Sequence, residues 1–127
     1  IITTPEVAAV RDADRIIGLL EAEGMAEPQL IINRIRHQMV RRGDMMDIDD
    51  VIEILAIDLL GIVPEDEIII ISTNRGEPAV TMPGSRAGQA FRNIARRMRG
   101  EVVPFLPLEE TRGILARLSR MMRLSSG

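Results

Sequence analysis

The 127-residue sequence predicts an α/β fold, a parallel β-sheet flanked by helices with an amphipathic helix at the carboxyl terminus. Three short apolar runs, within residues 1–5, 30–33 and 59–66, have the length and composition of strands that are buried on both faces of a parallel sheet. Segments with helical periodicity separate the runs, as in right-handed strand-helix-strand units. Because the run at 59–66 is apolar up to Pro64 except for one glycine, we expect it to be the central strand.

Turn-forming or polar residues follow each of the three predicted strands. They are Thr4-Pro5, Asn33-Arg34 and Pro64-Glu65-Asp66. The carboxyl ends of parallel strands meet at one edge of a sheet, where ligands of open α/β folds bind. We therefore expect these residues to share one rim.

The first predicted helix spans residues 6–23, with apolar residues at spacings of three and four. Thr4 is its expected N-cap, Pro5 suits the first helical position, and Gly24 ends the helix. Asp12 and Asp14 fall on its outward side. They form either a solvated charged face or a docking surface for another protein.

The acidic segment at 44–50 does not have the spacing of an EF-hand calcium loop, and we predict no metal site there. Instead, Asp47 is placed to cap a helix that runs through Val51, Ile52, Leu55 and Ala56. The four isoleucines at 68–71 favour a strand by propensity, but they follow the preceding strand too closely for a parallel crossover. An antiparallel strand and a buried helical turn both remain open.

Ser85 is placed to cap the next helix, which Gly100 ends. Its apolar stripe is predicted from the residues at helical spacing, Ala87, Phe91, Ile94, Ala95 and Met98. Residues 1–100 form the predicted sheet domain. Residues 101–108 contain Pro104 and Pro107, which exclude a regular helix, and are expected to be an extended connector.

Residues 109–127 are predicted to form an amphipathic helix and tail. At 100° per residue, one side collects apolar residues and the other collects arginines. The apolar side contains Ile114, Leu115, Leu118, Met121 and Met122, and the basic side contains Arg112, Arg117, Arg120 and Arg123. Such a helix can bind an anionic membrane surface or dock on its own domain or a partner. Nucleic acid is disfavoured because Phe91 and Phe105 are the only aromatic residues, which leaves no stacking platform.

Charge and composition restrict the function further. Residues 1–84 contain sixteen acidic residues and seven arginines, whereas residues 85–127 contain three acidic residues and nine arginines. The chain contains no lysine, so a phosphate-binding loop ending in Gly-Lys-Ser/Thr cannot lie within it. It also lacks cysteine, which excludes disulfides and thiolate metal sites. Residue 1 is an isoleucine that already lies in a strand-like run. We therefore expect a fragment of a longer protein.

Seven sequence motifs, in order, resemble the carboxyl-terminal half of the MinD family of septum site-determining ATPases. They are IITTPEV (1–7), VRDADR (10–15), INR (32–34), RGDM (42–45), DVIEIL (50–55), GIVPED (61–66) and NRGEP (74–78). This family belongs to the deviant P-loop ATPases, which also include chromosome-partitioning and flagellar-number ATPases. A relative of those two kinds, acting as a protein- or DNA-associated nucleotide switch, is the alternative.

The resemblance implies half of a P-loop NTPase-type sheet in a parent ATPase that places the division septum. ATP would be the ligand, with magnesium and the phosphate loop on the upstream half, so that this fragment alone is inactive. The resemblance assigns adenine contacts to five residues, Asn33, Arg34, Pro64, Glu65 and Asp66. It also implies a helix at 68–71.

The resemblance further implies partners and a location. Asp12 and Asp14 match positions that bind a division inhibitor and a hydrolysis-activating regulator. The parent is expected to form a homodimer in its ATP state. It would be cytoplasmic and peripheral on the inner face of the cell membrane, held there by residues 109–127.

Overall fold

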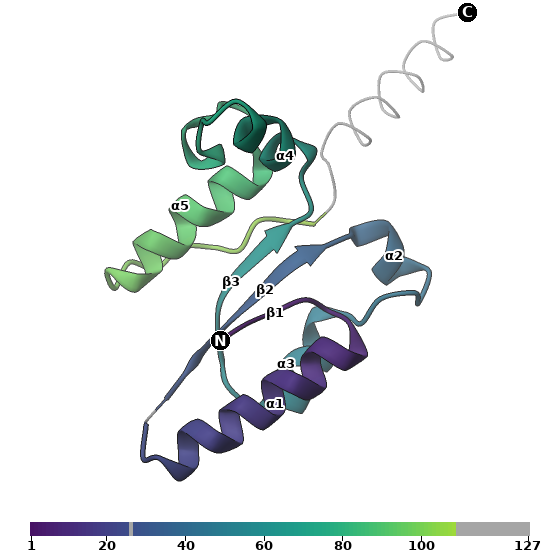
Figure 1. Ribbon diagram of the computed structural model, residues 1–127, viewed down its shortest axis with the longest axis vertical. Helices are drawn as coiled ribbons and strands as arrows, with labels where there is room; N and C mark the ends of the chain where they lie inside the picture. The colour runs from purple at the N-terminus through teal and green to yellow at the C-terminus, as the bar shows by residue number, and fades with distance from the viewer. Residues whose placement is uncertain (26, 109–127) are drawn as a thin grey trace, which may run out of the picture.

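The structure is a computed structural model that describes residues 1–25 and 27–108. Its strands β1 (Ile2–Thr3), β2 (Gln29–Ile35) and β3 (Asp58–Pro64) form a parallel sheet in the order β1-β2-β3. The predicted α/β fold with a parallel sheet is therefore confirmed (Figure 1). The predicted central position of the third strand is wrong for the described sheet, because β2 lies between the other two strands.

The apolar character of β3 has a different cause from a central position. Gly61, Val63 and Pro64 are buried, and helix α5 (Arg86–Met98) packs on β3. On its side away from β2, the backbone carbonyl of Leu60 accepts a hydrogen bond of 3.1 Å from the Arg97 guanidinium. A strand covered in this way is buried although it lies at the edge of the described sheet.

Helices α1 (Val7–Ala22) and α3 (Ile48–Leu55) cover one face of the sheet (Figure 1). The core on this face consists of apolar side chains from both helices and from β2, namely Val10, Ala13, Ile17, Leu30, Ile32, Ile35, Val51 and Leu55. The short helix α2 (His37–Arg41) follows β2 directly. Regular apolar spacing on α1 and α3 thus places the helices as predicted.

Two of three predicted caps are confirmed. The Asp47 carboxylate accepts from the Asp50 N–H at 2.8 Å, and the Ser85 hydroxyl oxygen accepts from the Gly88 N–H at 2.9 Å. The prediction for Thr4 is wrong, because Glu6 occupies the N-cap position of α1 and makes no side-chain cap bond. The prediction that Pro5 is the first helical residue is also wrong, because Pro5 precedes the N-cap, and its ring is almost fully buried.

Helices α4 (Glu67–Asn74), α5 and the 3₁₀ turn η1 (Ala79–Thr81) lie on the other side of β3 (Figure 1). The four isoleucines at 68–71 belong to α4, so the open choice is settled as a helix. Ile70 and Ile71 are 66% and 45% exposed, and the expected burial of this turn is therefore only partial. The helix forms because Asp66 caps it directly after β3.

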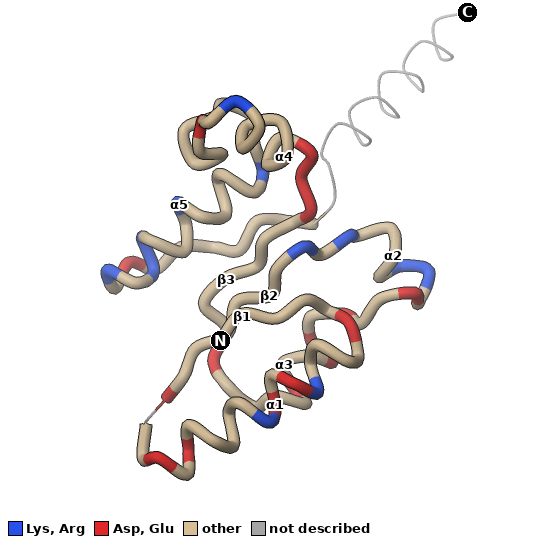
Figure 2. The backbone as a smooth tube through the Cα atoms, in the orientation of Figure 1, with Lys and Arg blue, Asp and Glu red and all other residues tan. Residues whose placement is uncertain are grey.

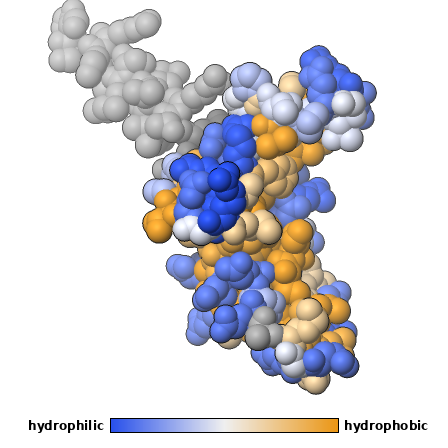
Figure 3. All heavy atoms as spheres, turned by 90° about the vertical axis from the view of Figure 1, so that its left-hand side faces the viewer, coloured by the Kyte–Doolittle hydropathy of each residue, from blue (hydrophilic) through white to orange (hydrophobic). Residues whose placement is uncertain are grey.

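The predicted apolar stripe of α5 is partly wrong. Phe91 and Met98 are 40% and 72% exposed, whereas the buried side contains Ala87, Gly88, Ala90, Asn93 and Ile94. Small residues let α5 approach its neighbours closely, and this proximity, rather than hydrophobicity alone, selects the buried side. Figure 3 shows hydrophobic patches among hydrophilic residues on one side of the molecule.

After Gly100 the chain turns back as the connector, residues 101–108, which forms neither helix nor strand. Among the described residues, no helix is both long and apolar enough to cross a membrane. The predicted amphipathic helix at 109–127 lies outside the described residues.

Candidate functional site

The carboxyl ends of β2 and β3 lie side by side. Ile32 pairs with Ile62 and Ile35 with Pro64, and the Glu65 N–H donates to the Ile35 carbonyl oxygen at 3.0 Å. Because the strands are parallel, the residues that end them reach the same edge of the sheet. The structure therefore brings the Asn33-Arg34 segment together with the Pro64-Glu65-Asp66 segment, and we call this edge the rim.

Asn33 and Arg34 form an irregularity in β2. They lie between the two paired positions Ile32 and Ile35, where β3 has only Val63. Two residues opposite one are the arrangement of a β-bulge, which redirects side chains and often occurs beside binding sites. Arg34 also has a φ of +58°, and a non-glycine residue in this region costs about 1–3 kcal/mol. No feature of the sequence INR predicts this bulge.

The Asn33 side chain stabilises the bulge with only part of its hydrogen-bonding capacity. Its Oδ1 accepts a 3.0 Å hydrogen bond from the backbone N–H of Arg34. An amide oxygen has two lone pairs and the amide nitrogen has two N–H groups, so both donor and acceptor capacity remain. Asn33 is half-buried. Its amide can thus recognise a ligand that offers an adjacent donor and acceptor.

Two arginines, one in β2 and one directly after it, share the carboxylate of the residue that follows β3. Glu65 pairs with Arg34, at 3.6 Å between Nη2 and Oε1, and with Arg36 through its other oxygen. Glu65 is 28% exposed in its side chain, whereas the two arginines are 68% and 56% exposed. The trio retains one positive charge, and Figure 2 shows basic residues where β2 ends. Arg36 was not predicted from the sequence, although its spacing of two from Arg34 places both on one side of an extended chain.

Asp66 is committed to the protein itself. Its Oδ1 accepts from the Ile68 N–H at 2.9 Å, and its Oδ2 accepts from the Ser85 hydroxyl at 2.8 Å and the Ala87 N–H at 3.1 Å. Burial raises the pKa of this carboxyl, but hydrogen bonds from Ser85 and from the backbone of Ile68, Ala87 and Arg86 outweigh burial and lower the pKa below 3.8. Asp66 thus caps α4 and α5 together and joins them to the rim.

The remaining rim residues differ in exposure. Pro64 is buried at the end of β3, so its ring supports the rim from beneath. Thr3 pairs with Ile32, which places the end of β1 and the following Thr4 beside the bulge. Asn33, Arg34, Arg36 and Glu65 are therefore the side chains that the rim can offer to a ligand.

Asp12 and Asp14 lie on α1, outside the rim. Both are exposed, and Asp12 pairs with Arg15 at 3.6 Å. Two large apolar residues on the same helix, Ile16 and Leu19, are 47% and 63% exposed. Exposed apolar side chains rimmed by polar residues are the kind of surface on which partners dock, and this side of α1 is therefore a candidate docking surface.

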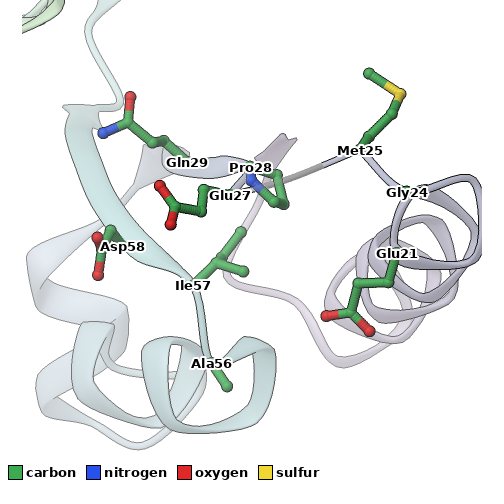
Figure 4. A pocket seen from close by; sticks show the side chains of 9 residues that line it. All are labelled: Glu21, Gly24, Met25, Glu27, Pro28, Gln29, Ala56, Ile57 and Asp58. Carbon is green, nitrogen blue, oxygen red and sulfur yellow. The ribbon is translucent and has the colours of Figure 1, made fainter.

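A hollow of about 800 Å³ lies at the opposite ends of the strands, where Gln29 and Asp58 begin β2 and β3. Figure 4 shows Glu21, Glu27 and Asp58 among its lining side chains. Three carboxylates repel an anionic ligand, so this hollow does not suit a phosphate-bearing molecule. Within residues 1–25 and 27–108, no cluster of three or more histidine or acidic side chains could hold a metal ion.

The predicted membrane-contacting residues all lie in 109–127, outside the described residues. They are Arg112, Ile114, Leu115, Arg117, Leu118, Arg120, Met121, Met122 and Arg123. The structure therefore leaves their role as a prediction.

Comparisons with known proteins agree with the fold. The chain is 54% identical over 128 residues to the putative septum site-determining protein MinD of Guillardia theta, covering 99% of this chain and 48% of that protein. It is 51% identical to MinD of Bacillus subtilis with the same coverage. The chain thus spans about half the length of these relatives. No protein-family model matches it.

Solved structures give the same result. The MinD cell division protein of Aquifex aeolicus has a TM-score of 0.80 and 42% identity, covering 84% of this chain and 45% of that chain. The MinC:MinD complex of the same organism has the same score and identity, with coverage of 84% and 44%. MinD of Pyrococcus horikoshii, complexed with Mg-ADP, has a TM-score of 0.65 and 29% identity, covering 76% and 40%. The chain therefore belongs to the MinD family of septum site-determining proteins, of which it represents the carboxyl-terminal half.

Proposed function

We propose that this chain is part of an ATPase that places the division septum, and that its rim binds the adenine of ATP. The observation that carries the proposal is the parallel pairing of β2 and β3, which joins Asn33 and Glu65 at one edge. The Pyrococcus horikoshii relative, which is complexed with Mg-ADP, supports a nucleotide as the ligand.

The rim residues fit an adenine ring. Adenine offers a ring-nitrogen acceptor beside an amino donor, and the spare amide groups of Asn33 match this pair. Arg34 and Arg36 leave one net positive charge near the ligand, which favours an anionic nucleotide. Asp66 fixes the loop that carries Glu65 instead of contacting the base.

The phosphates and magnesium require residues from elsewhere in the protein. This chain contains no lysine, and its described part offers no cluster of carboxylates for a metal. Magnesium, when bound, neutralises the phosphate charge during phosphoryl transfer. We infer that the other half supplies this function and that the present half holds the base.

The proposed partners follow from α1 and from the tail. The MinC:MinD complex of a relative supports binding of a division inhibitor, and the surface around Asp12 and Asp14, with exposed Ile16 and Leu19, suits such a partner and a hydrolysis-activating regulator. Residues 109–127 would hold the protein on the inner face of the cell membrane. One short basic helix binds an anionic bilayer weakly, whereas the two copies of an ATP-bound homodimer bind together with greater avidity.

Two substitutions at Asn33 test the rim in the full-length protein. Asn33→Asp retains the oxygen that accepts from the Arg34 N–H but loses the amide donor, whereas Asn33→Ala loses both. At about 0.5–1.5 kcal/mol for each lost hydrogen bond, Asn33→Asp should weaken ATP binding by roughly two- to tenfold. Asn33→Ala, which loses both, should weaken ATP binding by roughly five- to a hundredfold. Isothermal titration measures this, and Asn74→Ala at the end of α4 is the control. Unchanged ATP affinity in both Asn33 variants would contradict adenine binding at the rim.

A separate experiment tests membrane attachment. We expect Leu118→Glu to abolish co-sedimentation of the ATP-bound protein with phosphatidylglycerol vesicles, because a charge replaces the centre of the predicted apolar side. Ser119→Glu adds the same charge about 100° away and should retain most binding. Equal sedimentation of the wild type and Leu118→Glu would exclude this helix as the anchor.

A further inference from the structure

Arg97 holds the connector against β3. Its Nε donates to the Val103 carbonyl at 3.0 Å and its Nη2 to the Pro104 carbonyl at 3.0 Å. The third nitrogen, Nη1, donates to the Leu60 carbonyl of β3 at 3.1 Å. The guanidinium also lies 4.0 Å from the centre of the Phe105 ring, which adds a cation–π contact. One side chain therefore joins the connector to the open side of β3.

Arg86 holds the far end of the same connector. Its Nη1 donates to the Leu108 carbonyl at 3.1 Å, and its Nη2 donates to the Pro107 carbonyl. Arg86 and Arg97 are eleven residues apart on α5, which is about three helical turns and places them on the same side of the helix. The connector thus lies along that side, with one arginine near each end.

Apolar side chains of the connector reach both cores. Val103 is buried, Leu106 packs against the cluster beneath α5, and Leu108 packs against the cluster beneath α1 and α3. Pro104 and Pro107 have no N–H group and restrict the backbone, which lowers the entropy cost of holding the segment extended. The connector is therefore a packed strap rather than a loose linker.

The strap ends beside the rim. Residues flanking Arg86 on both sides, Ser85 and Ala87, donate hydrogen bonds to Asp66, which follows Glu65. Arg86 itself binds the carbonyl of Leu108, the last described residue. Leu108, the last described residue, is consequently linked to the rim through the hydrogen bonds of residues 85–87.

We propose that Arg86 and Arg97 are positioning residues, which clamp residues 102–108 as a strap and hold Leu108, after which the predicted membrane-binding segment begins, beside the rim. This inference rests on the proposed function, because it concerns how ATP binding and membrane attachment occur on the same side of the protein. The clamp requires arginine at position 97. Its planar fork reaches three carbonyl groups and stacks on a ring, whereas a lysine ammonium cannot reproduce that geometry.

Cleavage of the native full-length protein by chymotrypsin after Phe105 tests the clamp directly, since cleavage follows the population of locally opened chain. We expect Arg97→Gln and Arg97→Lys both to be cleaved about tenfold faster than wild type, because the strap opens more often without the guanidinium contacts to Val103 and Pro104. Arg86→Gln should also accelerate cleavage, and Arg86→Lys, which can still reach one carbonyl, should partly restore protection. Arg99→Gln, an exposed arginine at the end of α5, is the charge-matched control and should be cleaved at the wild-type rate.

Sedimentation with phosphatidylglycerol vesicles then tests positioning. We expect the two Gln variants at the clamp to retain ATP affinity but to lose most of the difference in vesicle binding between ATP and ADP. Wild-type cleavage rates in variants with unchanged circular dichroism would overturn the clamp. Faster cleavage with an unchanged ATP-to-ADP difference would overturn the positioning role. If the wild type does not bind vesicles at all, membrane attachment and with it the positioning role fail, while the cleavage rates still decide whether the clamp exists.

Discussion

Among the residues whose side chains cap the described helices, Asp66 should give the largest loss of stability when it is replaced by alanine. The carboxylate accepts hydrogen bonds from the Ile68 N–H of α4, the Ala87 N–H of α5 and the Ser85 hydroxyl. Loss of an N-cap interaction costs about 1 kcal/mol for each of the two helices, and a hydrogen bond from a hydroxyl to a charged group adds about 1.5–3 kcal/mol. Because the side chain is only half-buried, solvent screening reduces the total, and we expect a loss of about 3 kcal/mol in the free energy of unfolding.

Asp47→Ala is the matched comparison. Asp47 has the same chemistry but caps only α3, through one hydrogen bond of 2.8 Å to the Asp50 N–H. Its removal should cost about 1 kcal/mol. Urea denaturation of nucleotide-free full-length protein, followed by circular dichroism, measures both losses. If the two substitutions reduced the free energy of unfolding equally, the assignment of Asp66 as a cap shared by two helices would be wrong.

One further outcome concerns the same carboxylate, and two concern glycines at close approaches between elements. The pKa of Asp66 is lower in the folded state than its ordinary value of 3.8. The stabilisation by its carboxylate is therefore fully present above pH 3.8 and is lost as the pH falls through the folded-state pKa. In urea titrations below pH 3.8, the difference in the free energy of unfolding between wild type and Asp66→Asn should shrink. Gly61→Ala should lower the free energy of unfolding by about 1–3 kcal/mol, because the added Cβ would overpack against Ile94 Cγ1, 2.3 Å away. Ile94→Ala removes that atom, so a double-mutant cycle of the two substitutions should show a favourable coupling energy. Gly88→Ala should lower the melting temperature more than Gly61→Ala does, because its Cβ would lie 2.2 Å from the Ala79 carbonyl oxygen, a backbone atom that no neighbouring side-chain substitution removes.

Much of the fold could be predicted because it depends on residues close together in the sequence. Apolar runs separated by amphipathic helices predict a parallel sheet, and the caps at Asp47 and Ser85 are local interactions between a side chain and the next turn. The prediction that Asn33 and the Pro64 turn end side by side follows from the same rule, since consecutive parallel strands end at one edge. Local pattern was insufficient at 68–71, because the strand propensity of four isoleucines competes with a helix start that Asp66 caps through the Ile68 N–H.

The candidate site could be predicted only in outline. The motifs placed Asn33, Arg34, Pro64, Glu65 and Asp66 together, but the structure gives them different positions. Pro64 is buried beneath the rim, and Asp66 binds the helices α4 and α5. Arg36, which shares Glu65 with Arg34, was missed because Glu65 follows the next strand along the chain, and the sequence does not show which arginine it contacts.

The sequence by itself determined the order of strands and helices, the parallel sheet and the family, because periodicity and motif order are properties of neighbouring residues. The tertiary structure alone decided the bulge at Asn33 and Arg34, the side of α5 that is buried, and the arginine clamp on residues 102–108. Each of these depends on how closely two distant segments approach. An arginine that binds backbone carbonyls from another segment cannot be distinguished in the sequence from one that faces solvent.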